Sequence, residues 1–349
     1  MRSLAGLFEP FQLKGLTLKN RVMMSPMCQY SVWAKDGAPN DWHFVHYVSR
    51  AVGGAGLIMT EMTDVVPDGR ITVHDLGIWD DAHIPAFGRV IDQVHGYGAK
   101  IGIQIAHAGR KAESPELRPE APSAIAFSEK YRVPHALTGD EVKGVVEAFR
   151  QGARRAVEAG VDTVELHGAH GYLIHQFMSP ISNQREDEYG EPTRFGVEVI
   201  QAVKSVLPSQ MPLMMRLSAT EFTDQGYTFD QLLEMAKVFH QHGVDMFDIS
   251  SGGNAMAKIH SYPGFQTPYA AALKRAVNVP VLAVGRLESY DLAASLLEHD
   301  DVDMVAIGRG MLKDPYWVNS AALHFEGTVQ VPFEYHRAFP QRFVKGEKS

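Results

Sequence analysis

Short apolar segments alternate with longer segments of helical periodicity along most of this chain. The apolar segments lie at residues 22–27, 57–60, 100–105, 163–166, 213–217, 246–249, 281–284 and 304–307. Strands that are apolar along their whole length are typical of parallel sheets whose two faces are both covered by helices. We therefore predict eight parallel strands, each followed by a helix.

The segment between the third and fourth of these strands shows the helical signals most clearly. Thr138 and Glu141 have the spacing of a capping box, which predicts the start of a helix. Gly160 follows the last helical position, where glycine can adopt the left-handed conformation that ends a helix. Thr228 with Gln231 predicts a second capping box in a later unit. The positions that share one predicted buried face are Val142, Val145, Val146, Phe149, Ala153, Ala156 and Val157.

Eight strand–helix units predict a (β/α)8 TIM barrel, a fold for which about 250 residues suffice. The chain has 349 residues. We expect the surplus in an N-terminal extension, in a capping insertion from Ala108 to about Gly139 after the third strand, and in a C-terminal tail at about 326–349. Residues 1–349 would form a single domain. The alternative is an open doubly wound sheet, which is less favoured because no Gly-x-Gly-x-x-Gly follows the first strand.

Composition narrows the classes of function. The net charge is −8 and no basic block occurs, so nucleic acid and anionic membrane surfaces are poor partners. Cys28 is the only cysteine, which excludes an internal disulfide and any cysteine-held zinc or iron–sulfur site. The sequence has neither a visible signal peptide nor the roughly 18 unbroken apolar residues of a membrane helix, so we expect a cytoplasmic protein.

Polar, titratable and glycine residues gather where the predicted strands end. In a TIM barrel these ends lie together at the carboxyl face, where the chemistry takes place. We therefore expect one active site at this face. Its candidate residues are Ser25, Pro26, Met27, Cys28, Tyr30, Met62, Gln104, Arg110, Lys111, His167, His170, Tyr172, Arg216, Gly285, Gly308 and Arg309.

Two groups among these residues indicate a specific chemistry. Barrels commonly bind phosphate with the loops after strands seven and eight, so Gly285, Gly308 and Arg309 predict a phosphate site. His167 and His170 have a spacing that a zinc site could use, but a metal site needs a third ligand and an activated water. Tyr172 follows two residues later and fits better as a proton donor, so we predict no metal.

Six motifs occur in order along the chain. They are Leu7-Phe8-Glu9-Pro10, Asn20-Arg21-Val22, Ser25-Pro26-Met27-Cys28, Gln104-Ile105-Ala106-His107-Ala108-Gly109-Arg110-Lys111, His167-Gly168-Ala169-His170-Gly171-Tyr172 and Ile307-Gly308-Arg309. With them the chain resembles the Old Yellow Enzyme family, FMN-dependent ene-reductases built on a TIM barrel. Cys28 with Tyr30, and Tyr335-His336-Arg337 in the tail, are similar to the bacterial thermophilic-like branch, class III.

The resemblance implies a binding site for FMN. Ser25, Pro26, Met27 and Cys28 would line the flavin, and the Cys28 thiol would tune the flavin's potential. Met62 would contact the ring system through its backbone, and Gln104 would bond its pyrimidine edge. Arg216 would lie beside N1 and the C2 carbonyl, where a fixed guanidinium favours the reduced state. The phosphate site at Gly285, Gly308 and Arg309 would hold the FMN phosphate.

The resemblance also implies a ping-pong reaction in which NAD(P)H and then an activated alkene use one site. His167 and His170 would donate hydrogen bonds to the carbonyl or nitro oxygen of the alkene, and Tyr172 would supply the proton. Tyr30 would contact the substrate from the opposite wall. Arg337 would reach the site of a neighbouring subunit, which implies a homodimer or homotetramer.

Two further details concern the coenzyme and one loop. Arg110 and Lys111 are weak indications of a contact to the 2′-phosphate of NADPH. The stretch from Asp187 to Phe195 is a few residues shorter than in family members, and we expect it on the active-site face.

Three other interpretations compete with the ene-reductase. A 2,4-dienoyl-CoA reductase-like flavoenzyme is less favoured, because its relatives carry a cysteine-bound cluster and a further domain. A metal-dependent barrel hydrolase would use His167 and His170. A catalytically inactive barrel would serve as a binding module.

Overall fold

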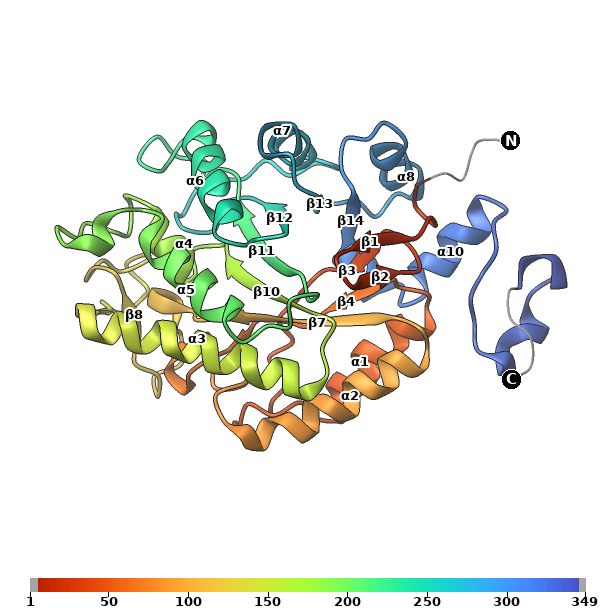
Figure 1. Ribbon diagram of the computed structural model, residues 1–349, viewed down its shortest axis with the longest axis horizontal. Coiled ribbons are helices and arrows are strands. Elements are labelled where there is room, and N and C mark those ends of the chain that lie inside the picture. The colour runs from red at the N-terminus through yellow and green to blue at the C-terminus, as the bar shows by residue number, and fades with distance from the viewer. Residues whose placement is uncertain (1–5, 345–349) are drawn as a thin grey trace.

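The computed structural model describes residues 6–344, in which eight parallel strands form a closed ring (Figure 1). The ring closes because the last strand pairs with the first, and the third pairs with the fourth. Each of the eight predicted segments forms one of these strands, so the TIM barrel is confirmed and the open sheet is wrong. The strands are β3 (Val22–Met24), β4 (Leu57–Met59), β7 (Lys100–Ala106), β10 (Thr163–Gly168), β11 (Leu213–Ser218), β12 (Met246–Ser250), β13 (Val281–Ala283) and β14 (Met304–Ile307).

Helices cover the outside of the barrel (Figure 1). In α3 the predicted capping box of Thr138 and Glu141 is present, and Gly160 ends the helix with φ of 97°. Thr228 and Gln231 cap α6 in the same way. The helices are α1 (Asp41–Val52), α2 (Ile84–Gly96), α3 (Gly139–Ala159), α4 (Leu173–Met178), α5 (Arg194–Lys204), α6 (Phe229–Gln241), α7 (Thr267–Val277), α8 (Tyr290–Glu298), α9 (Arg309–Lys313) and α10 (Trp317–His324).

The N-terminal extension closes the amino end of the barrel. It forms an antiparallel hairpin of β1 (Phe11–Leu13) and β2 (Leu16–Leu18). Apolar side chains of this hairpin pack against the methionine-rich interior of the barrel. Burying this surface stabilises the fold and leaves only the carboxyl end for a site. The cluster includes Phe11, Leu16, Leu18, Met23, Met59, Met214, Met246 and Met304.

The insertion after β7 lies at the opposite end from this hairpin, as β8 at one edge of Figure 1 and β1 toward the other show. It contains the parallel pair β8 (Glu120–Ala121) and β9 (His135–Ala136). Two further short strands, β5 (Thr63–Asp64) and β6 (Leu76–Gly77), extend the sheet from β7. Short 3-10 turns connect these parts: η1 (Pro67–Gly69), η2 (Asp81–His83), η3 (Gly109–Lys111) and η4 (Glu188–Gly190).

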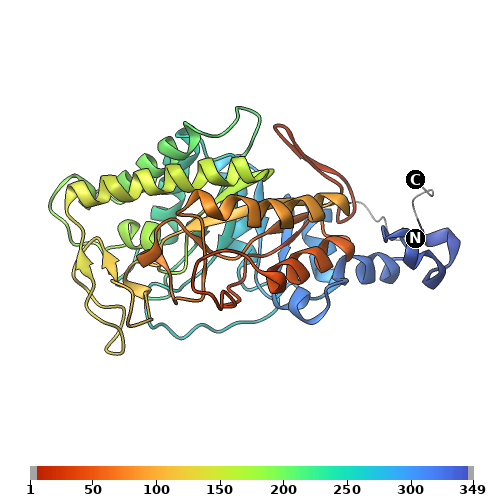
Figure 2. The ribbon, with the colours of Figure 1, turned by 90° about the horizontal axis from the view of Figure 1, so that it is seen from below.

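The predicted tail begins soon after α10 and contains η5 (Phe333–Ala338) and η6 (Gln341–Phe343). Both views place this segment beyond the hairpin end of the barrel, far from β8 and β9 (Figure 1; Figure 2). Residues 1–5 of the extension and 345–349 of the tail lie outside the described residues. The prediction of one domain over the whole chain stays a prediction.

Candidate active site

A tight turn after β10 brings three of the predicted residues together. His170 and Gly171 both have left-handed backbones, with φ of 58° and 73°. The turn folds the chain back so that the His167 ring lies 5.1 Å from the ring of His170 and 4.8 Å from that of Tyr172, measured between centroids. The structure therefore assembles the predicted His167, His170 and Tyr172 cluster.

Both histidines of this cluster are neutral donors of hydrogen bonds. Burial and the nearby Arg216 lower the pKa of His167 and of His170 well below the ordinary value. The Ala169 N–H donates to Nδ1 of His167 over 3.3 Å, so the hydrogen of that neutral ring is on Nε2. Nε2 of His170 lies 2.7 Å from the Ser250 hydroxyl, and Nδ1 of His170 presents an N–H to a ligand when that hydroxyl donates to Nε2. His167 can offer its Nε2–H to a ligand.

A small apolar cluster adjoins Tyr172 and carries hydroxyl and thiol groups at its edge. Cys28 and Tyr172 pack against one buried cluster that includes Met62 and Ala106. Burial, followed by the charge of Glu61, raises the pKa of the Cys28 thiol, so the thiol is uncharged. Burial likewise raises the pKa of Tyr30 and of Tyr172, and both phenols are protonated at neutral pH. Tyr172 can therefore act as an acid.

A layer of charged and amide groups lies at the bottom of the site, inside the barrel. Strand register aligns Glu165 with Gln104 and Arg216 with Asp248. The Gln104 amide donates to Glu165 over 2.7 Å, and Nε of Arg216 lies 3.1 Å from Asp248. The Arg216 side chain also reaches the Ser25 hydroxyl, with 3.4 Å between Nη2 and Oγ. The carboxylates thus hold the predicted Gln104 and Arg216 in place.

Sequence reasoning missed these two carboxylates. Burial raises the pKa of Glu165 to about 8 and that of Asp248 to about 6, and Arg216 opposes both shifts. A charged residue inside an otherwise apolar strand segment was a visible signal in both cases. It identifies a buried polar position, but only the register between strands shows which group each one meets.

A cavity of 180 Å³ lies between the ends of β13 and β14, where the phosphate site was predicted. Gly285, Arg286, Gly308 and Arg309 are among its lining residues. Gly285 has φ of 134°, a conformation that other residues rarely adopt. A Cβ on Gly308 would lie 3.6 Å from the Met27 sulfur, so this glycine keeps space open beside the first strand.

These groups fit the FMN that the resemblance implies. A fixed guanidinium at Arg216 suits the electron-rich edge of a flavin. The amide of Gln104, oriented by Glu165, keeps its carbonyl oxygen as an acceptor for a ring N–H. The glycine-lined cavity between β13 and β14 offers backbone N–H groups to a phosphate.

Two predicted residues lie elsewhere. Arg110 is 1% exposed and its guanidinium donates to the Asn254 backbone and side chain, so the expectation of a 2′-phosphate contact is wrong for this residue. Lys111 does face the site, because its Nζ lies 5.2 Å from the centroid of the Tyr172 ring. Arg337 lies in η5, which Figure 1 shows beyond the hairpin end of its own barrel.

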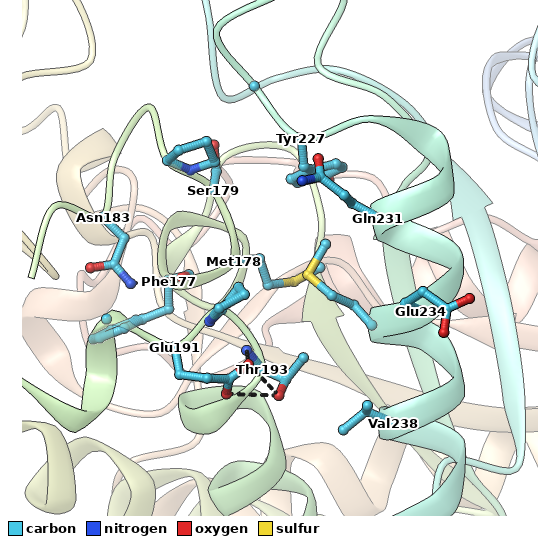
Figure 3. A pocket seen from close by; sticks show the side chains of 15 residues that line it. Phe177, Met178, Ser179, Asn183, Glu191, Thr193, Tyr227, Gln231, Glu234 and Val238 are labelled. Atoms are coloured by element: carbon cyan, nitrogen blue, oxygen red, sulfur yellow. Dashed lines mark hydrogen bonds between the residues drawn. The ribbon is translucent and has the colours of Figure 1, made fainter.

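A groove on one flank of the barrel is separate from this cluster (Figure 3). It has a volume of 560 Å³ and lies between the end of α4, the start of α5 and one face of α6. Gly190, Glu191, Pro192 and Thr193 line it. The short 187–195 stretch connects β10 to α5, so it lies at the carboxyl end of the barrel, as expected, and borders this groove. No predicted site residue lines the groove.

Neither metal binding nor membrane insertion is indicated by the described residues. Among residues 6–344, no group of three or more His, Cys, Asp and Glu side chains is arranged to hold a metal ion. None of the helices within this range has the length and apolar character needed to cross a bilayer. The cytoplasmic location stays a prediction.

Residues 6–327 match the sequence model of the NADH:flavin oxidoreductase / NADH oxidase family. The chain belongs to this family. An NADPH dehydrogenase of Geobacillus sp. (strain WCH70) is 44% identical over 95% of this chain and 98% of its own length. An NADPH dehydrogenase of Listeria innocua is 45% identical over 95% of this chain and 99% of its own length.

Two solved structures are similar to this chain in fold. Morphinone reductase is 27% identical, with a TM-score of 0.79 over 99% of this chain and 95% of its own. A 2-naphthoyl-CoA reductase has a TM-score of 0.87 and is 23% identical, which shows the fold alone; this chain spans about half the length of that protein, 52%.

Membership of the flavin oxidoreductase family confirms the resemblance to the Old Yellow Enzymes and the expected FMN cofactor. The protein is an oxidoreductase, so the hydrolase and the inactive binding module no longer compete. The matched relatives named above are NADPH dehydrogenases that are covered almost end to end.

Proposed function

We propose that this protein is an FMN-dependent NAD(P)H:ene reductase that reduces the C=C bond of α,β-unsaturated carbonyl compounds and nitroalkenes in a ping-pong reaction. The observation that carries the proposal is the cluster of His167, His170 and Tyr172 at the carboxyl end of a barrel with Arg216 beneath it. The names of the relatives support NADPH as the electron donor.

The two histidines would bind the oxygen atom of the alkene. Because their lowered pKa values keep both rings neutral, each offers an N–H and neither acts as the acid. Two such donors withdraw charge from the double bond as a hydride reaches its β-carbon, which is the logic of an oxyanion hole. Tyr30, on the other wall, would add a contact to the substrate.

Tyr172 would donate the proton to the α-carbon. Its ring packs edge-on to His167, at 74° between planes, which places the phenol beside the histidine that would bind the oxygen. Burial raises its pKa, which keeps the proton in place until charge develops on the substrate.

The remaining predicted residues would hold the cofactor, which when bound supplies the hydride. Ser25, Pro26, Met27 and Cys28 would line it on one side, with Met62 and Gln104 at further edges. Arg216 would stabilise negative charge at the electron-rich edge. Gly285, Gly308 and Arg309 would bind the phosphate.

Arg337 would serve the site of a second subunit. Its exposed position beyond the hairpin end of the barrel places it far from its own carboxyl end, which supports a role in trans. The functional unit would then be a homodimer or a homotetramer, in which each site is completed by a neighbour.

The test is a spectrum of the purified protein followed by an anaerobic titration. We expect flavin absorbance bands, loss of these bands on addition of NADPH, and their return on addition of cyclohexenone. A protein that binds no FMN, or whose bands return with oxygen but not with any activated alkene, would contradict the proposal.

A further inference from the structure

In the turn that carries the histidine cluster, side chains bind the backbone N–H and carbonyl groups of His170 and Gly171. The His170 N–H donates to the Ser218 hydroxyl over 3.0 Å, and the Gly171 N–H donates to Nδ1 of His175 over 2.9 Å. The two carbonyl groups are bound as well, that of His170 by Lys111 Nζ and that of Gly171 by Gln176 Nε2. Two consecutive left-handed residues, of which one is not glycine, persist only when their surroundings fix them.

The two N–H contacts belong to one closed chain of hydrogen bonds. Because Nδ1 of His175 accepts from Gly171, the ring carries its hydrogen on Nε2, which lies 2.9 Å from the Tyr227 hydroxyl. That hydroxyl donates to the Ser218 carbonyl over 2.6 Å. The chain therefore returns to the residue whose hydroxyl receives the His170 N–H.

A buried carboxylate fixes the direction of this chain. Although burial opposes it, hydrogen bonds from His175, Asn254 and Ser179 lower the pKa of Glu221, so the carboxylate is charged. Its Oε1 lies 3.3 Å from Nε2 of His175, which favours a hydrogen on that nitrogen. His175 and Glu221 are buried, and Asn254 links the carboxylate to the Arg110 guanidinium.

The turn has little space in which to shift. A Cβ on Gly171 would meet the Gly253 carbonyl oxygen at 2.3 Å, and one on Gly253 would meet His170 Cα at 2.5 Å. The loop after β12 therefore lies directly against the turn. A displacement of the turn by 1 Å at a reacting centre can reduce a rate about 100-fold.

We propose that His175 and Tyr227 are positioning residues for the proposed reduction, acting through the Gly171 amide on the orientation of His170 and Tyr172. This inference rests on the proposed function, because it assigns a task to residues that do not themselves touch the substrate. Tyr227 also lines the groove of Figure 3, so its ring lies between the groove and the turn.

The test variant is Tyr227→Phe, which removes one hydroxyl and keeps the ring. In the FMN-loaded enzyme we expect the rate of cyclohexenone reduction to fall about 10- to 100-fold. We expect the charge-transfer band with 4-chlorophenol to require about tenfold more phenol, while reduction by NADPH changes less than about twofold. Tyr189→Phe is the matched control, since Tyr189 is equally buried and its hydroxyl donates to Glu198 on α5.

A second measurement does not depend on catalysis. In the protein without cofactor, amide hydrogen exchange of the peptide that contains Gly171 should be at least about tenfold faster in Tyr227→Phe than in Tyr189→Phe. Faster exchange in a protein that shows no ene-reductase activity would support the positioning of the turn and contradict only the proposed function. Exchange and phenol binding that match the control would overturn the inference.

The His175 variants test the direction of the contact. The side-chain oxygen of His175→Asn can accept from the Gly171 N–H in place of Nδ1, whereas His175→Leu cannot. We expect Asn to recover at least about a third of the wild-type phenol affinity and Leu to lose tenfold or more. Equal losses in the two variants would show that the Gly171 contact does not position the turn.

Discussion

At the scale of single residues, Arg216 is the cation that offsets the charge of two buried acids inside the barrel. Its guanidinium lies between the strands that carry Glu165 and Asp248, whose carboxyl groups are both fully buried. One cation beside two carboxyl groups leaves at least one of them protonated or partly uncompensated, and burial of an uncompensated charge is costly. The pKa values of both acids are therefore raised, because burial outweighs the effect of the Arg216 charge.

This balance predicts a pH dependence of stability in the protein without cofactor. The pKa of Glu165 in the folded chain is about 8, above its ordinary value of 4.5, so folding is favoured when Glu165 is protonated. The stabilisation is fully present below about pH 4.5 and is lost as the pH rises through about 8. We expect the Glu165→Gln variant to lose less thermal stability than the wild type between about pH 6 and about pH 9.

Glu61 is a second buried acid that contributes to the same pH dependence. Burial also raises the pKa of Glu61 to about 8, so the variant should keep part of the slope. Thermal midpoints recorded across this pH range would contradict the argument if Glu165→Gln and the wild type lose stability in parallel.

Tyr172 carries the sharpest kinetic prediction. Tyr172→Phe should slow alkene reduction roughly 10- to 10⁴-fold, the usual contribution of a general acid, and leave reduction by NADPH little changed. Stopped-flow measurement of the two half-reactions checks both parts with the same enzyme. An equal loss in the two half-reactions would remove Tyr172 from the role of proton donor.

The sequence predicts some of these residues well and others not at all. His167, His170 and Tyr172 follow one strand directly, so local order alone places them together. The partner of Arg110 is Asn254, 144 positions away, and no local pattern indicates that this guanidinium is buried. His175 and Tyr227 were missed for the same reason, because their contact joins α4 to the loop before α6, 52 positions away.

At the scale of elements, the signals that succeed are the local ones. All eight strands lie where continuous apolar runs predicted them, since burial on both faces leaves that pattern in the sequence. The capping boxes of α3 and α6 are also local, because their partners are three positions apart. The groove between α5 and α6 has no such signal, because it depends on how two helices and a short loop pack.

The cap of α3 gives a prediction at this scale. Thr138→Ala removes the hydroxyl that accepts from Glu141 N–H and should lower the free energy of unfolding by about 1 kcal/mol. Thr193→Ala is the control, since Thr193 precedes α5 without making a side-chain cap and its hydroxyl donates to Glu191 instead. Urea unfolding of both variants decides the point, and an equal change in the two would show that the cap of α3 contributes no more than this surface hydrogen bond.

At the scale of the whole molecule, the two ends of the barrel have different tasks. The β1–β2 hairpin fills the amino end with apolar side chains, and the insertion after β7 lies at the carboxyl end beside the site. The C-terminal segment extends beyond the hairpin end in both views (Figure 1; Figure 2). A tail that projects from the closed end of one barrel can complete the open end of another only in an oligomer.

Mixing two variants of reduced activity tests this arrangement. Arg337→Ala should lower kcat/KM about tenfold, the size expected for one hydrogen bond to a charged group, and Tyr172→Phe lowers it further. If Arg337 acts in the neighbouring subunit, a mixed dimer has one site with both defects and one intact site. Activity should therefore rise above that of either variant after the subunits exchange. If Arg337 acts in its own subunit, every site in the mixture keeps one defect, and exchange restores nothing. Recovery on mixing thus separates the two arrangements without any further structure, because only action between subunits can regenerate an intact site.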